Sequence, residues 1–146
     1  PSLKAISKFG WRSNAKELVL AEDIAEKFTI DSSRLEEEAG VLSGGNQQKV
    51  ALGKWLSINP KVILVNEPTR GVDVGARAEI YAKLRALADG GAAIVVASTD
   101  IQEISNLPDR VLTYYRGMHI GEIGLDKMTA ANILKQITDP FDETNL

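Results

Sequence analysis

Hydrophobic positions recur along this chain with two different periods, and each period predicts one kind of element. In residues 14–30 apolar side chains return every three or four positions, which predicts an amphipathic helix. Those positions are Leu18, Ala21, Ala25 and Phe28. Asn14 is the expected N-cap of this helix, because Glu17 follows three residues later, as in a capping box.

Helical and extended segments alternate from residue 41 onward. Helices are expected after the turn at residues 42–45 as far as residue 57, then over 75–88, from about 101, and over 129–138. Strands are expected over residues 62–65, 92–97, 111–115 and 118–123. The first two strands are uninterrupted apolar runs, which predicts burial on both faces. The last two form a hairpin through Arg116-Gly117.

This order of elements favours an α/β layer with parallel strands, followed by a C-terminal hairpin and helix. Residues 1–40 are more polar and read as a separate helical lobe, so we expect one division of the chain into 1–40 and 41–146. The acidic run at residues 36–38 is typical of a solvated face.

Composition narrows the classes of function. The chain has 146 residues, enough for one sizeable core, and a net charge of −3, which argues against a nucleic-acid partner. It contains no cysteine, so disulfides and thiolate metal sites are excluded. The longest apolar run, residues 92–97, falls far short of the roughly 20 residues that cross a bilayer.

Two places carry candidate chemistry. Ser43, Gly44 and Gly45 open a helix, where backbone N–H groups, a hydroxyl and the helix dipole favour an anion. The same residues also make an ordinary helix cap, and both interpretations stay open from the residues alone. Glu67 follows an apolar strand, at the end of a sheet where α/β folds bind ligands. Alone, it is equally an acid at a strand end before a proline turn.

Three ordered segments resemble the motifs of ATP-binding-cassette (ABC) ATPases. Residues 42–47, LSGGNQ, look like the signature motif. Residues 62–69, VILVNEPT, resemble the Walker B strand and the acid after it. Residues 70–76, RGVDVGA, look like the D-loop in the form found in monosaccharide importers. The match runs from about residue 41 to 123 and implies the C-terminal part of a nucleotide-binding domain, a partial P-loop NTPase-like fold.

The resemblance implies a division of labour between two ATPase domains that pair head to tail. The residues expected to contact ATP held by the partner domain are Ser43, Gly44, Gly45, Asn46 and Gln47. Glu67 is the expected catalytic carboxylate beside the attacking water, and Asp73 is the D-loop acid.

Two positions depart from the family pattern. Asn66 stands where the family has the aspartate that holds Mg²⁺ through water, and an amide is a poorer ligand for that ion. Thr99 stands at the switch position, where the family has a histidine, and a hydroxyl cannot carry the imidazolium charge. Both changes predict a catalytically weak site, and Thr99 favours the second of two tandem domains. An alternative explanation for Asn66 is a deliberate substitution at this position, made to trap ATP.

The sequence has no phosphate loop of the pattern G-x-x-x-x-G-K-[ST]. Its one Gly-Lys pair, Gly53-Lys54, lies inside a predicted helix and is followed by Trp55. We therefore expect ATP and Mg²⁺ to be cofactors of a full-length protein, with neither bound by this chain alone, and we expect the chain alone to be inactive as an enzyme.

The resemblance implies part of an ATPase subunit that energises sugar import. The implied partners are a second ATPase domain, membrane permease subunits and, indirectly, a periplasmic sugar-binding protein; the implied location is the cytoplasm, on the inner face of the membrane. Two alternatives remain: an ABC ATPase without a transport role, and a non-catalytic regulatory or structural module. A sheet with unpaired edges also predicts self-association.

Overall fold

The computed structural model describes residues 6–8 and 11–139, and its chain divides into two compact units. The first unit comprises Pro1–Leu64 and Pro68–Val95, and the second comprises Val65–Glu67 and Val96–Leu146. None of the described helices is both long and apolar enough to cross a membrane.

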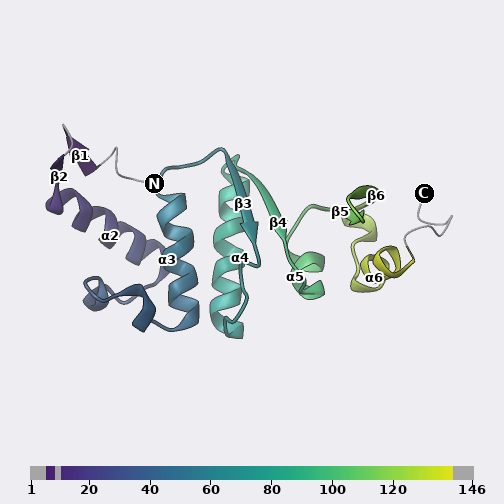
Figure 1. Cartoon of the computed structure of the whole chain (residues 1–146), viewed down its shortest axis with the longest axis horizontal. Helices are drawn as coiled ribbons and strands as arrows, with labels where there is room; N and C mark the ends of the chain where they lie inside the picture. The colour runs from purple at the N-terminus through teal and green to yellow at the C-terminus, as the bar shows by residue number, and fades with distance from the viewer. Residues whose placement is uncertain (1–5, 9–10, 140–146) are drawn as a thin grey trace. The chain divides into compact units, whose positions relative to one another are not determined.

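Helices dominate the first unit, and Figure 1 shows α2 lying beside α3. In chain order its elements are β1 (Ser7–Lys8), β2 (Trp11–Arg12), α2 (Asn14–Phe28), the 3₁₀ turns η1 (Ser32–Arg34) and η2 (Ala39–Val41), α3 (Gly44–Leu56) and α4 (Val74–Asp89). The antiparallel pair β1–β2 differs from the sequence prediction of a helical lobe over residues 1–40. The long helices lie close to their expected bounds.

The cap of α2 differs from the prediction. Ser13, not Asn14, is the N-cap: its hydroxyl accepts from the Lys16 amide at 3.5 Å. Serine and asparagine are almost equally good caps, so two adjacent candidates cannot be separated by residue type. The helix ends at Thr29, which takes a left-handed conformation with φ of 53°.

Helices α2 and α3 pack closely through a small residue. A Cβ at Gly53 would collide with the side chain of Ile24 and lie 3.3 Å from the ring of Phe28. Gly53 therefore lets the two helices approach. The core of this unit also contains Ala25, Leu52, Leu56, Ile80 and Leu84, all buried.

Strands β3 (Val62–Asn66) and β4 (Ala93–Ala97) form a two-stranded sheet. At one end Ala93 N donates to Lys61 O at 2.9 Å, and at the other Glu67 N donates to Ala97 O at 2.8 Å. Because corresponding ends are joined, the strands run parallel, as predicted.

Burial of these strands on both faces was a wrong prediction. Val62, Leu64 and Val95 are 61%, 78% and 57% exposed, whereas Ile63 between two of them is buried. The described residues cover only one face, although the sequence of each strand suits burial on both.

The second unit is built around a β-hairpin. It contains α5 (Ile101–Asn106), β5 (Arg110–Tyr115), β6 (Met118–Gly124), the 3₁₀ turn η3 (Leu125–Lys127) and α6 (Ala130–Thr138). Val111, Ile123 and Ile133 form its buried centre, which joins the hairpin to α6 (Figure 1). Arg116 and Gly117 have φ of 47° and 82°, the turn geometry that matches the twist of a tight hairpin. This part agrees with the sequence prediction.

Candidate functional site

The signature-like turn, residues 42–47, forms the start of α3. Ser43 is the N-cap, and its Oγ accepts from Asn46 N at 3.4 Å. Gln47 Nε2 donates to Leu42 O at 2.8 Å, which ties the helix back to the preceding chain. The first amides of a helix have no intrahelical carbonyl to bind, and they lie at the positive end of its dipole. The turn is therefore chemically suited to an anion.

The D-loop-like segment, residues 70–76, lies directly against this turn within the same unit. A Cβ at Gly44 would be 3.0 Å from the carbonyl oxygen of Gly71. A Cβ at Gly45 would be 3.1 Å from Ala76 Cβ and 3.8 Å from Asp73 Oδ2. A Cβ at either position would therefore be tight against this segment, so glycine at both positions favours close packing of the turn.

Asp73 caps the next helix. Its Oδ1 accepts from Ala76 N at 2.9 Å, so the carboxylate is held at the start of α4. The structure thus brings the signature-like residues and Asp73 together in the first unit.

About one helical turn further along α3, an ion pair connects α3 to α4. Lys49 Nζ pairs with a carboxylate oxygen of Glu79, and the Lys49 side chain is 8% exposed against 47% for Glu79. Sequence reasoning missed this contact. The signal was a lysine on the α3 face shared with buried Gly45, Leu52 and Leu56.

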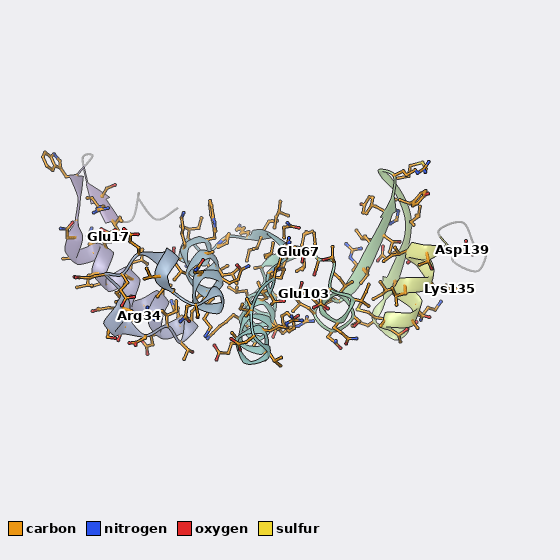
Figure 2. All side chains as sticks on the ribbon, turned by 60° about the horizontal axis from the view of Figure 1, so that its bottom comes forward. Glu17, Arg34, Glu67, Glu103, Lys135 and Asp139 are labelled. Atoms are coloured by element: carbon orange, nitrogen blue, oxygen red, sulfur yellow. The ribbon has the colours of Figure 1, made fainter. Side chains whose placement is uncertain are left out.

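Glu67 and Thr99 meet in the second unit. Thr99 donates to Glu67 Oε1 twice, from its backbone N and from its Oγ1, both at 2.9 Å. Glu67 has φ of 50°, a left-handed conformation that is unusual for a residue with a side chain. Figure 2 labels Glu67, with its side chain drawn as sticks. Both residues follow the ends of paired strands, which is why residues 32 positions apart lie in contact.

Asn66 is the last residue of β3 and is exposed. Among the described residues, no group of three or more His, Cys, Asp or Glu side chains is placed to hold a metal ion. A neutral amide such as that of Asn66 is a poorer ligand for Mg²⁺ than a carboxylate.

Shifted pKa values occur away from these residues, in the segment after α2. Hydrogen bonds from the Ser33 hydroxyl and amide lower the pKa of Asp31 below its ordinary value. A hydrogen bond from Arg34, with a 2.6 Å contact, lowers the pKa of Glu37 and raises that of the arginine. All three groups are open to solvent, so these shifts indicate local order, not catalysis.

Known proteins are similar to this chain in both sequence and fold. Residues 5–70 match the family described as ABC transporter. A nucleotide-free ATP-binding cassette from an ABC transporter superposes with a TM-score of 0.75 at 25% identity, covering 97% of this chain and 56% of that one. A dimeric cassette bound to ADP and Pi gives 0.70 at 25% identity, covering 81% and 51%. The chain belongs to the ATP-binding proteins of ABC transporters, and its fold is a partial P-loop NTPase-like fold.

Within this class the chain is similar to ribose import ATP-binding proteins. It is 42% identical over 146 residues to ribose import ATP-binding protein RbsA 2 of Rhizobium meliloti, covering 99% of this chain and 28% of that protein. It is 47% identical over 128 residues to ribose import ATP-binding protein RbsA of Ruegeria sp., covering 88% and 25%. The chain therefore spans about a quarter of the length of these relatives.

Proposed function

We propose that this chain supplies the signature half of an ATP site in the ATPase of a sugar importer, acting on ATP whose phosphates are held by a second cassette. The observation that carries the proposal is the signature-like turn at the start of α3, which packs against the D-loop-like segment. The similarity to ribose import proteins supports sugar import as the process.

The proposed contacts follow from hydrogen-bond chemistry. The amides of Gly44 and Gly45 and the hydroxyl of Ser43 are donors suited to a γ-phosphate. Asn46 and Gln47 belong to the same turn, where Gln47 fixes the chain by its bond to the Leu42 carbonyl. Because the turn is preformed, little conformational entropy is lost when the phosphate binds.

Glu67 is proposed as the carboxylate that orients the attacking water, with Thr99 beside it at the switch position. We propose that hydrolysis at this site is slow, because Asn66 and Thr99 replace an acidic and a cationic group by neutral ones. Mg²⁺ would bind together with ATP in the assembled protein, where it would neutralise charge on the ATP phosphates. No step of the proposal depends on its being held by Asn66.

The neutral pair Asn66 and Thr99 also favours a second function: a regulatory cassette that binds ATP at the interface without hydrolysing it. Retained ATP-dependent association together with no turnover would select this alternative. An ABC ATPase outside transport is disfavoured by the similarity to ribose import proteins.

Further partners are proposed from the same similarity: permease subunits, with a periplasmic sugar-binding protein beyond them, and a location on the inner face of the membrane.

Self-association through the exposed strand face is proposed from Val62, Leu64 and Val95. Light scattering over a range of concentrations tests this point. Replacing Leu64 by threonine keeps β propensity, removes apolar surface, and should lower the apparent mass of any oligomer.

Substitutions at Ser43 test the proposed function with a matched control. Aspartate and asparagine cap a helix about as well as serine, so S43D and S43N should both preserve α3. Only S43D adds a negative charge where the γ-phosphate would bind. The assay is ATP-dependent association of the chain with an ABC cassette that carries a phosphate loop.

S43N should associate nearly as well as the parent chain, whereas S43D should weaken association by tenfold or more, since one close charge repulsion corresponds to about 1.4 kcal/mol or more. Equal association of both variants would rule out a phosphate contact at this turn. Association without ATP in every variant would show that the interface does not depend on nucleotide.

A further inference from the structure

Helices α3 and α4 contact each other at two places that lie about one helical turn apart. At the first place, a Cβ at Gly45 would be 3.1 Å from Ala76 Cβ. At the second, Lys49 Nζ forms its ion pair with Glu79. The residue numbers increase from the first place to the second on both helices. The two helices therefore run in the same direction away from their N-caps.

The first contact alone leaves the angle between the helices free to change. Gly45 has no side chain and Ala76 has one methyl group, so their contact limits how closely the helices approach and little else. Lys49 projects from the same face of α3 as Gly45, one turn further on, and it is buried. A second contact at this distance opposes pivoting about the first, so the ion pair sets the angle between the helices.

Stability alone does not explain a lysine at this buried position. Exchanging a buried ion pair for apolar side chains of similar volume is often neutral or stabilising, and a methionine would fill the space of Lys49. Apolar contacts have no preferred direction, whereas a buried ammonium group needs one particular partner. The pair with Glu79 therefore specifies the register of α3 against α4 more than it stabilises the fold.

The angle between α3 and α4 determines how their two N-caps are arranged. Ser43 Oγ accepts from Asn46 N at the start of α3, and Asp73 Oδ1 accepts from Ala76 N at the start of α4. Each polar group is thereby fixed to its own helix and moves with it. A change in the angle would displace the Ser43 hydroxyl relative to the Asp73 carboxylate.

We propose that Lys49 and Glu79 are positioning residues: their ion pair holds α3 and α4 at one angle and so keeps Ser43 and Asp73 in one relative arrangement. The consequence for ATP rests on the proposed function of the signature-like turn, because donors arranged before a phosphate arrives need not be ordered when it binds. The positioning itself involves no nucleotide, and it is testable in the 146-residue chain.

Residual dipolar couplings of the backbone amides measure the relative orientation of the two helices by NMR. Couplings from helices at a fixed angle fit one alignment tensor, whereas helices that pivot against each other need two tensors of different magnitude. K49M removes the charge at similar volume, and K49R keeps the charge. G53A is the control for lost stability, because it disturbs the α2–α3 contact and leaves the ion pair in place.

The parent chain, K49R and G53A should each fit one tensor for α3 and α4, whereas folded K49M should need two tensors or show a changed angle. Two tensors in the parent chain, or one tensor with an unchanged angle in folded K49M, would overturn the proposal. If K49M does not fold, E79Q decides instead, because it removes the charge at the half-exposed partner and keeps the side-chain length. An unchanged angle in E79Q would then overturn the proposal.

The association assay with an ABC cassette that carries a phosphate loop connects the positioning to ATP. K49M should weaken ATP-dependent association about tenfold, less than the roughly hundredfold that a misplacement of about 1 Å can cost. K49R and G53A should match the parent chain. Unchanged association in K49M, despite a changed angle, would refute the consequence for ATP. Failure of the proposed function itself would appear separately, as equal association of S43D and S43N.

Discussion

The ion pair between Lys49 and Glu79 should have unequal effects when its two members are removed. The lysine is buried and the glutamate is half exposed, so the lysine charge loses more when its partner is removed than the glutamate charge does. E79A leaves an ammonium group with little access to water. Breaking a fully buried pair costs roughly 3–5 kcal/mol. Because solvent reaches the Glu79 side of this pair, we expect about 1–2 kcal/mol of destabilisation.

K49M removes the charge but keeps a long unbranched stem of similar volume. Replacing a buried charge by an apolar side chain is often nearly neutral, so the expected loss is below about 1 kcal/mol. The two values should differ although each substitution deletes the same ion pair. The double variant K49M/E79A should resemble K49M alone, because no unpaired ammonium group is left behind.

Urea unfolding followed by tryptophan fluorescence measures these changes. Trp55 lies on α3 and reports the first unit when Trp11 is replaced by phenylalanine. With a slope of about 1–3 kcal/mol per molar urea, a loss of 1–2 kcal/mol is a resolvable shift of the midpoint. A midpoint unchanged by E79A, or one lowered more by K49M than by E79A, would refute the reasoning.

Two further predictions concern the segment around α2. G53A should destabilise the first unit by about 1–3 kcal/mol in the same urea assay, because the added methyl group would collide with the side chain of Ile24. G40A is the control and should have little effect, because no atom lies within 4 Å of the added Cβ. An equal loss of stability in both variants would count against tight α2–α3 packing. A carboxyl NMR titration should place the pKa of Asp31 below its ordinary value, and S33A should raise it. Since the folded state has the lower pKa, this contribution to stability is complete above the unfolded pKa and is lost as the pH falls through the folded one. An identical titration in S33A would contradict the assigned cause.

Element positions were predictable where local chemistry decides them. The helices following residues 43 and 73 begin at side chains that cap them, and the hairpin turns at Arg116-Gly117, where positive φ is required. Ambiguity arose where two adjacent residues cap equally well, as at Ser13 and Asn14. Burial of the strands was predicted wrongly because a run of apolar residues specifies what a strand tolerates, not what covers it.

Contacts between distant residues were not predictable from the sequence. The site residues themselves came from motif resemblance, and their roles stay predictions. The pairing of Lys49 with Glu79 depends on the register of α3 against α4, and the two bonds from Thr99 to Glu67 depend on how β3 and β4 end. Local periodicity does not determine either relation. The packing of Gly45 against Asp73 and Ala76 is a third example.

Calorimetric titration of ATP with Mg²⁺ into the 146-residue chain tests the central claim most directly. The claim is that Ser43–Asn46 act on ATP held elsewhere and that this chain carries no phosphate loop of its own. The account predicts no measurable heat of binding for the chain alone. Stoichiometric binding at micromolar affinity, about −8 kcal/mol, would contradict it, because it would require a complete nucleotide site within these residues.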